Sequence, residues 1–327
     1  TTTFTIDGET ARDFDDAVSL QRLDNGNLLL GVHIADVSHY VHPESELDRE
    51  ARLRSNSVYF LDRVIPMLPH QLSNEICSLN PEVDRLTMSA LMELTPGGEM
   101  RSHRIVPSVI RSRARLTYTV ANRLISETDG GDVEDFEHFR GTLREMADLA
   151  MTLRGNRMDG GSMDFDLPEA EMIFDVEGGL QSIIRAERNV AHQLIEEFML
   201  LANKAVAAHI TTRGFPSIFR THEKPDPEKL EEFASFAGAM GYDIRGVERG
   251  SSIVLQRILK QAVDKPEELI INNLLLRSMK QARYTVDNIG HFALAFDCYT
   301  HFTSPIRRYP DLLVHRILKL LHDGVKV

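Results

Sequence analysis

The stretch Thr3-Phe-Thr-Ile-Asp-Gly-Glu-Thr-Ala-Arg-Asp-Phe-Asp-Asp16 (TFTIDGETARDFDD) places a cluster of acidic residues directly behind an apolar, β-branched run. Residues 3–6 are typical of a strand, because β-branched and aromatic side chains pack well on a pleated surface. The acidic residues are Asp7, Asp13, Asp15 and Asp16. Asp7 ends the predicted strand and the other three run into a second one, so we expect one sheet edge to bring all four together.

Two hairpins are predicted in the first third of the chain. The first turns at Asn25-Gly26, because this dipeptide supplies the positive φ angles that a type I′ turn requires. The second turns at Pro96-Gly-Gly98. The predicted strands are residues 17–23 and 28–34 for the first hairpin, and 86–94 and 104–110 for the second. The N-terminal third is therefore expected to be mostly sheet.

Helical periodicity dominates after Tyr118. The strongest pattern runs through residues 191–208, where apolar side chains recur at the spacing of one helix face. Further helices are predicted at residues 133–157, 226–240, 251–263, 266–283 and 305–322, with short strands at 165–174 and 292–299. We therefore expect an α+β fold, in which one large domain has a mixed sheet in its N-terminal third and helices packed behind it.

Length and composition restrict the class of protein. The 327 residues allow either one large domain or about two of roughly 150 residues. No apolar run approaches the ~20 residues of a membrane helix and no signal peptide is visible, so we expect a cytoplasmic protein. Cys77 and Cys298 lie too far apart for a disulfide framework or a cysteine zinc site. The net charge of -12 argues against a general nucleic-acid-coating surface, so any RNA or DNA binding must be local.

Carboxylates gathered at one edge require protons or cations. Two of them about 4 Å apart repel by roughly 4 kcal/mol at an effective dielectric constant of about 20. Aspartate offers the hard oxygen ligands that suit Mg²⁺ or Mn²⁺, and Mg²⁺ completes its shell with water and substrate phosphate. Two such ions roughly 4 Å apart activate a water and stabilise the leaving oxygen of a phosphodiester. The cluster therefore indicates a site for Mg²⁺, with Mn²⁺ as the alternative ion.

Other interpretations of the acidic cluster stay open. Its members are also compatible with solvated loop acids or turn formers. An EF-hand calcium loop fits poorly, because the residues after Asp13 break the D-x-[DN]-x-[DN]-G spacing. A phosphatase-type D-x-D nucleophile would follow directly on an apolar strand, whereas Thr10-Ala-Arg12 precedes Asp13.

A second unusual stretch, HFTSPIRRY, covers residues 301–309. It places Thr303, Ser304, Arg307 and Arg308 at the start of a predicted helix. A helix N-terminus presents free N–H groups and a partial positive charge that favour phosphate. Arginine adds a bidentate clamp that lysine cannot copy, so one of the two arginines is a candidate for holding a scissile phosphate. The alternative is a Ser N-cap with arginines in surface ion pairs.

Together these stretches resemble the RNB domain of the RNase II and RNase R exoribonucleases. The matching segments are DGETARDFDDA, IPMLPHQLSNEICSLNP, FRTHEKPDPEKL, AHQLIEEFMLLAN and HFTSPIRRYPDLLVHR. The resemblance covers residues 1–327 nearly end to end and implies one RNB catalytic domain. It also implies processive 3′-to-5′ hydrolysis of single-stranded RNA to nucleoside 5′-monophosphates at a two-metal site.

The resemblance assigns roles to residues by motif position. Asp7 and Asp16 would hold the principal magnesium, Asp15 would be the acid whose loss abolishes chemistry, and Asp13 would support the cluster. Arg307 would contact the phosphate, beside the other candidate phosphate ligands Thr303, Ser304 and Arg308. Tyr118 would help to set RNA over DNA and the final product length, and Tyr59 and Phe165 would stack the terminal bases.

Physical chemistry agrees with these aromatic and acidic assignments. Stacking on an aromatic face is worth ~1–3 kcal/mol per base without reading sequence, which suits an exonuclease. Ribose preference requires hydrogen bonds to the 2′-OH, and Glu196 or Glu197 is the candidate acceptor. The alternatives are core or strand packing for Tyr59, Tyr118 and Phe165, and a solvated helix face for the two glutamates.

Members of this family carry cold-shock-like OB domains before this region and an S1 domain after it, and neither lies in this chain. The chain begins without Met at a residue that looks like part of a strand, so an excised fragment is one expectation. The missing modules, or a partner, would supply much of the RNA affinity. A catalytically silent RNA-binding or scaffold member of the same fold is the alternative function, and a calcium-binding module is a third. RNase II type versus RNase R type stays open.

Overall fold

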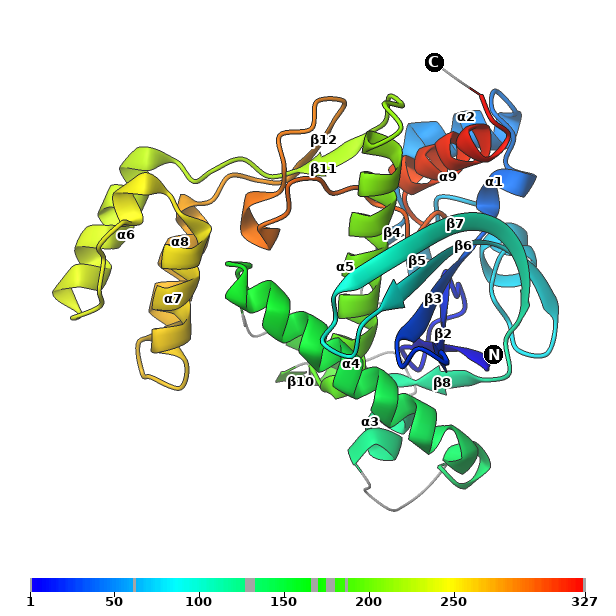
Figure 1. Cartoon of the computed structure of the whole chain (residues 1–327), viewed down its shortest axis with the longest axis horizontal. Coiled ribbons are helices and arrows are strands. Elements are labelled where there is room, and N and C mark those ends of the chain that lie inside the picture. The colour runs from blue at the N-terminus through cyan, green and yellow to red at the C-terminus, as the bar shows by residue number, and fades with distance from the viewer. Residues whose placement is uncertain are drawn as a thin grey trace. The chain divides into compact units, whose positions relative to one another are not determined.

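The computed structural model describes residues 2–60, 63–126, 133–165, 170–174, 180–185 and 188–325 (Figure 1). The chain forms two compact units. The sheet unit comprises Thr1–Leu153, Arg188–Ile218 and Thr300–Val327, and the helical unit comprises Arg154–Glu187 and Phe219–Tyr299. The predicted α+β class, with a mixed sheet and helices, is confirmed.

A six-stranded sheet organises the sheet unit, with the strand order β7-β6-β3-β2-β1-β8. Its strands are β1 (Thr3–Asp7), β2 (Asp16–Arg22), β3 (Leu28–Ala35), β6 (Asp84–Leu94), β7 (Met100–Arg111) and β8 (Arg115–Thr117). Both predicted hairpins are present, as β2–β3 and β6–β7. The predicted type I′ turn is wrong, because Gly26 has a positive φ of +80° but Asn25 does not. The Leu23 N–H donates to the Asn27 carbonyl, so the loop has three residues and places its glycine in the left-handed region. Neighbouring strands are antiparallel except β1 and β8, which run parallel. This pairing sets Asp7 opposite Thr117.

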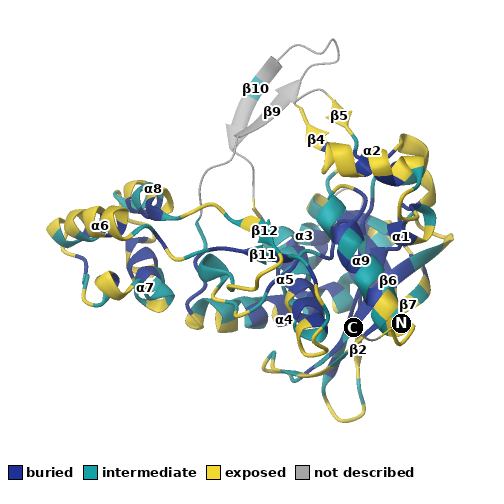
Figure 2. Ribbon diagram, turned by 90° about the horizontal axis from the view of Figure 1, so that it is seen from above, coloured by how far each residue is buried: buried dark blue, intermediate teal, exposed yellow. Residues whose placement is uncertain are grey.

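Alternating side chains of the sheet enter two separate apolar cores. Figure 2 colours much of β6 as buried. One face, which includes Phe4, Val32 and Met88, packs against α3 (Tyr118–Ser126), α4 (Arg140–Asp159) and α5 (Val190–Thr211). The other face, which includes Ala17 and Ala35, packs against a smaller apolar cluster containing Ile306 and the start of α9 (Tyr309–His322). The second face therefore brings the C-terminal stretch of the chain to the strand that follows Asp15.

Short elements surround this sheet. They are α1 (Val37–Tyr40), α2 (Glu46–Arg54), β4 (Val58–Tyr59), β5 (Val64–Ile65), the π-helical turn η1 (Gln71–Ile76) and the 3-10 helix η2 (Glu134–Phe139). Helix α2 begins after Ser45, whose side chain accepts a hydrogen bond from the Asp48 N–H as an N-cap. β4 and β5 form a small antiparallel hairpin.

The helical unit has its own core, which includes Met163, Phe233, Ile258 and Leu275. Its elements are β9 (Ala170–Phe174), β10 (Leu180–Arg185), β11 (Phe219–Thr221), α6 (Pro227–Ala239), η3 (Val247–Arg249), α7 (Ser252–Ala262), α8 (Glu268–Ser278), β12 (Arg283–Thr285) and η4 (Phe292–Leu294). The predicted strand at 292–299 is replaced by η4 and irregular chain, because the His291 side chain accepts from the Leu294 N–H and Ala295 turns to a positive φ. None of the helices in the described part of the chain has the length and apolar character needed to cross a bilayer.

The last helix begins later than its sequence predicts. Residues 305–307 form a turn, Arg308 forms an isolated β-bridge with Asn56, and α9 starts at Tyr309 with Pro310 in its first turn. The Ser304 N–H donates to Asp311 Oδ1 at 2.9 Å, so an aspartate inside the helix reaches back to the chain before it. Ser304 is therefore held by α9 rather than capping it.

Candidate active site

Asp7 and Asp16 lie at the ends of neighbouring antiparallel strands, β1 and β2. The loop after Asp7 is held from the parallel side of β1, where Arg115 Nη2 donates to the carbonyl oxygens of Gly8 at 2.6 Å and Glu9 at 2.8 Å. The Thr119 hydroxyl donates to Glu9 Oε1 at 2.6 Å. The segment 115–119 therefore fixes the backbone that carries Asp7.

Asp15 joins the two unusual stretches of the sequence. Its side chain is 4% exposed, and Oδ1 accepts a hydrogen bond of 2.9 Å from the Ile306 N–H. Asp15 Oδ2 lies 3.8 Å from Arg307 Nε. The Arg307 side chain is 47% exposed, so its guanidinium reaches from the buried carboxylate toward solvent. A ligand phosphate approaching this edge would therefore meet Arg307.

Burial dominates the electrostatics of these aspartates. Desolvation, with the neighbouring Asp16 as the next cause, raises the pKa of Asp7 to about 8. Desolvation also raises the pKa of Asp16 to about 6, against the opposing effect of Arg307 and Arg308. Burial raises the pKa of Asp15 well above its ordinary value, although Arg307 opposes it. Each charged carboxylate is therefore costly here without a cation.

The donor set fits a divalent ion held by few protein ligands. Within the described part of the chain, Oδ2 of Asp7, Asp15 and Asp16 is buried and accepts no hydrogen bond. Among the same residues, no three His, Cys, Asp or Glu side chains converge closely enough to hold a metal between them. Mg²⁺ typically takes only one or two carboxylates and completes its shell with water and phosphate. Asp7 and Asp16 are the pair that suits it, whereas a cage of all four acids is not present in the described chain.

Asp13 contacts the β4–β5 hairpin through Tyr59. Tyr59, on β4, donates its hydroxyl to Asp13 Oδ2 at 3.3 Å and is 52% exposed. Partial burial and the charge of Asp13 raise the pKa of Tyr59 to about 12, so the phenol keeps its proton. The ring is therefore available to a base beside the acidic cluster.

Phe165, the second predicted stacking residue, is partly buried against the core of the helical unit. Tyr59 belongs to the sheet unit, so the predicted pair is divided between the two units. The two predicted 2′-OH acceptors also differ. Glu197 is buried, whereas Glu196 is partly exposed and forms a 2.6 Å ion pair with Arg188.

Tyr118 begins α3 immediately after the strand that pairs with β1. Desolvation, with Asp16 as the next cause, raises the pKa of its phenol above the ordinary range. The ring stacks on His192 of α5 with a centroid distance of 3.9 Å and an interplanar angle of 17°. Sequence reasoning did not select His192, whose only local signal is its place in the first turn of the helix.

The four polar residues of the second stretch have different partners. Thr303 and Ser304 are buried, and the Ser304 hydroxyl accepts a 3.2 Å hydrogen bond from Arg307 Nη2. Arg308 makes two bonds to Asp311, of 3.0 Å from Nε and 2.8 Å from Nη2, and Asp311 is 0% exposed. Arg308 therefore neutralises a buried carboxylate inside the fold, while Arg307 faces the acidic cluster.

Replacing Arg308 by Ala is expected to lower the free energy of unfolding by about 3 kcal/mol, because it leaves the Asp311 charge buried without its partner. Urea unfolding followed by circular dichroism measures this change. Arg52→Ala, on the exposed face of α2, is the matched control and should stay within about 0.5 kcal/mol of the wild type. Equal stabilities for the two variants would contradict the structural role of Arg308.

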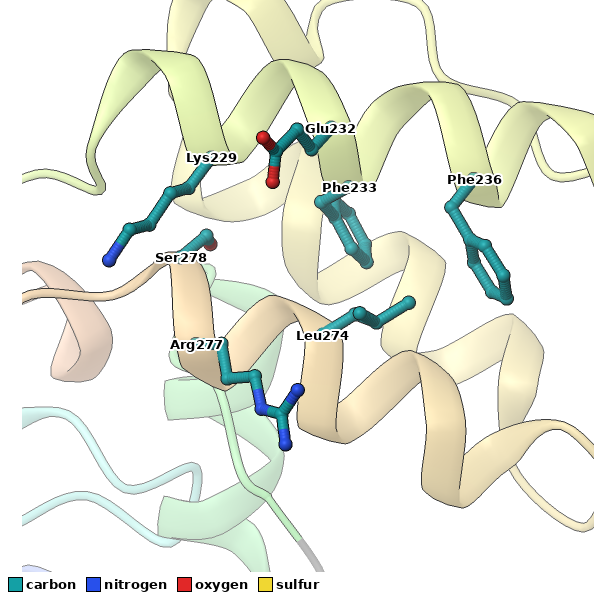
Figure 3. A pocket seen from close by; sticks show the side chains of 7 residues that line it. All are labelled: Lys229, Glu232, Phe233, Phe236, Leu274, Arg277 and Ser278. Atoms are coloured by element: carbon teal, nitrogen blue, oxygen red, sulfur yellow. The ribbon is translucent and has the colours of Figure 1, made fainter.

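The helical unit contains a separate pocket of about 490 Å³ between α6 and α8 (Figure 3). Phe233, Phe236 and Leu274 line one end, and Lys229 and Arg277 lie toward the other. None of the residues predicted for metal or RNA binding lines it. The pocket is therefore distinct in composition from the acidic site.

Comparison with known proteins identifies the family. The model of the RNB domain family matches residues 1–324. The chain belongs to the RNB family. This RNB chain is 47% identical to Ribonuclease R 1 of Lactococcus lactis over 98% of its own length and 39% of that protein. It spans less than half the length of its curated relatives from Lactococcus lactis, Thermotoga maritima and Aquifex aeolicus.

Solved structures show the same fold. RNase R of Mycoplasma genitalium in complex with ribose-methylated single-stranded RNA superposes with a TM-score of 0.91, at 30% identity over 99% of the RNB chain and 51% of that chain. Yeast Ssd1, a pseudonuclease, superposes with a TM-score of 0.79 at 23% identity, over 100% of the RNB chain and 40% of that chain. The second likeness concerns the fold alone. The RNB fold is thus shared by a nuclease and a protein without that activity.

Proposed function

We propose that this chain is the catalytic domain of a 3′-to-5′ exoribonuclease that hydrolyses single-stranded RNA processively to nucleoside 5′-monophosphates. The observation that carries the proposal is the buried Asp15, which accepts the Ile306 N–H and lies beside Arg307, where Asp7 ends β1 and Asp16 begins β2. The similarity to proteins named Ribonuclease R supports the same conclusion.

The proposed chemistry divides among the residues of this edge. Asp7 and Asp16 would hold Mg²⁺, which supplies activation of a water and stabilisation of the leaving oxygen, with a second ion completing the two-metal arrangement. Arg307 binds the scissile phosphate and stabilises the negative charge that develops on it. Asp15, whose Oδ2 lies 3.8 Å from Arg307 Nε, would orient the Arg307 guanidinium and contribute negative charge that favours binding of a cation. Ser304 holds the other side of the same guanidinium through its 3.2 Å hydrogen bond.

RNA affinity would come from local contacts because the chain as a whole is acidic. Tyr59 presents its half-exposed ring to a terminal base. Phe165 stays a proposed base-stacking residue of the helical unit. Glu196 is the better placed of the two candidate 2′-OH acceptors, since Glu197 is 2% exposed. OB-type and S1 modules, or a partner protein, would supply the remaining RNA-binding affinity.

Replacing Tyr59 by Ala is expected to weaken binding of single-stranded RNA about tenfold, because one stacked base is worth ~1–3 kcal/mol. Fluorescence anisotropy with a labelled oligonucleotide in the background of Asp15→Asn measures binding without hydrolysis. Phe60→Ala, at an equally exposed aromatic in the adjacent position, is the matched control and should change the affinity less than twofold. A smaller effect for Tyr59→Ala than for Phe60→Ala would rule out the stacking role.

Magnesium is expected to raise the melting temperature more at about pH 8 than at about pH 5.5. In the folded, metal-free chain the pKa of Asp7 is about 8 and that of Asp16 is about 6. In the unfolded chain both aspartates lose their protons near pH 4, as aspartates ordinarily do. The stability of the metal-free chain therefore falls as the pH rises through this window. Mg²⁺ competes with those protons, so its stabilising effect grows as they leave.

Thermal unfolding in EDTA and in millimolar Mg²⁺, at both pH values, measures this effect. Asp16→Asn should abolish the magnesium-dependent increase, and Asp24→Asn, at an exposed turn, should retain it. An increase that is equal at both pH values, or that survives in Asp16→Asn, would exclude this carboxylate pair as the metal site.

A catalytically silent RNA-binding protein is the second candidate, since the pseudonuclease Ssd1 shares the fold. The presence of Asp7, Asp15, Asp16 and Arg307 favours the enzyme. Incubation with a 3′-labelled single strand and Mg²⁺ separates the two, because only the enzyme releases labelled mononucleotide. An intact labelled strand that stays bound to the protein would support the silent member.

A further inference from the structure

The stacked rings of Tyr118 and His192 connect the strand end at Asp7 to α5, which packs with α3 on one face of the sheet. Tyr118 follows Thr117, whose backbone lies opposite Asp7 in the parallel β1–β8 pair. His192 comes from the first turn of α5, 74 positions later in the chain. The centroid distance of 3.9 Å and the angle of 17° mean that the two rings overlap face to face.

The start of α5 fixes the imidazole. Asn189 is the N-cap of this helix, and its Oδ1 accepts hydrogen bonds from the N–H groups of Ala191 at 3.1 Å and His192 at 3.3 Å. The same oxygen lies 2.9 Å from His192 Nδ1. One side chain therefore holds both the helix terminus and the plane of the ring, so the imidazole has little freedom to rotate.

The charged groups near His192 have other partners. Glu9 accepts from Thr119, and Glu196 forms an ion pair with Arg188. Burial is the largest cause of the lowered pKa of His192, which keeps the ring neutral at pH 7. The imidazole thus presents a flat, uncharged surface to the phenol.

The stack on His192 fixes the plane of the Tyr118 ring. Among aromatic contacts within the described residues, His192 is the ring that stacks on it. The phenol lies close enough to Asp16 and Asp7 for their charges to affect its pKa, so a change in its ring plane moves the hydroxyl relative to the acidic edge. We propose that His192 is a positioning residue that fixes the ring of Tyr118 beside the RNA 3′ end, an inference that rests on the proposed function.

The test compares His192→Ala with His192→Phe. A misplacement of about 1 Å costs up to about 100-fold in rate. His192→Ala should therefore lower kcat about tenfold with KM within twofold, and lengthen the final product. His192→Phe keeps a flat ring and should recover kcat to within about threefold of the wild type. Unchanged kcat in His192→Ala, or an equally low kcat in His192→Phe, would overturn the inference.

A structural readout makes the test independent of turnover. The ring current of Tyr118 shifts the imidazole proton resonances of His192 upfield, and Tyr118→Leu should move them downfield. The resonances of His103 and His209, which contact each other instead, are the internal control. Unmoved His192 resonances would disprove the stack.

The outcome also separates this inference from the proposed function. A wild-type chain that releases no nucleotide would overturn both. A wild-type chain that hydrolyses RNA, together with His192→Ala at the same rate and product length, would overturn only the role of His192.

Discussion

Asp15→Asn is expected to lower the rate of RNA hydrolysis by about 10³-fold while leaving RNA affinity within about twofold. The substitution is nearly isosteric, so the side-chain oxygen still accepts the 2.9 Å hydrogen bond from the Ile306 N–H. The charge facing Arg307 and the neighbouring acids is lost. The change therefore acts on charge at the reacting edge and leaves the local backbone in place.

Stability provides a second, independent expectation for the same variant. Because burial raises the pKa of Asp15 well above its ordinary value, the ionised carboxylate is costly in the metal-free fold. A neutral amide removes that cost. The melting temperature of Asp15→Asn without metal should therefore equal or exceed that of the wild type at about pH 8, so lost activity cannot come from unfolding.

Single-turnover hydrolysis of a 3′-labelled RNA, with binding measured by anisotropy, gives both quantities. Asp24→Asn makes the same chemical change at an exposed turn and should retain the wild-type rate. Hydrolysis by Asp15→Asn at the wild-type rate would show that the chemistry resides elsewhere.

The sequence predicts those elements of the fold that depend on interactions between residues close together in the chain. The Asn25-Gly26 turn, the strand that ends at Asp7 and the long helix after Asn189 each follow from residues next to one another in sequence. The parallel pairing of β1 with β8 does not, because its partners, such as Thr5 and Arg115, are 110 residues apart. That pairing is what brings Tyr118 to Asp7.

Residues 301–309 also show that long-range contacts, here of single side chains, cannot be predicted from local sequence. Arg307 and Arg308 are adjacent and chemically identical, so local sequence chemistry does not separate them, and only the family resemblance assigns the phosphate contact to Arg307. The structure separates them through Asp311, which is buried and binds Arg308, and through Asp15, 292 positions away from Arg307, which lies 3.8 Å from its Nε. The roles of these two residues depend on which carboxylate the fold brings to each, and that is decided by long-range packing.

Arg307→Lys is expected to lower kcat by about 10²-fold, with a smaller effect on RNA affinity. Lysine keeps the positive charge but loses the planar fork. In the wild type, that fork is oriented by Ser304 through a 3.2 Å hydrogen bond to Nη2 and by Asp15 near Nε. A phosphate bound by two N–H groups in a fixed plane gains more as charge develops than one bound by a rotating ammonium group.

The kcat and KM of Arg307→Lys on single-stranded RNA test whether geometry or charge alone is needed. Arg52→Lys, the same substitution on exposed α2, should leave both constants unchanged. Addition of guanidinium ion to Arg307→Ala should restore part of the lost rate, because the free ion can occupy the space beside Asp15. A wild-type kcat in Arg307→Lys would mean that a point charge suffices at this position, and the phosphate clamp would have to be assigned to another residue.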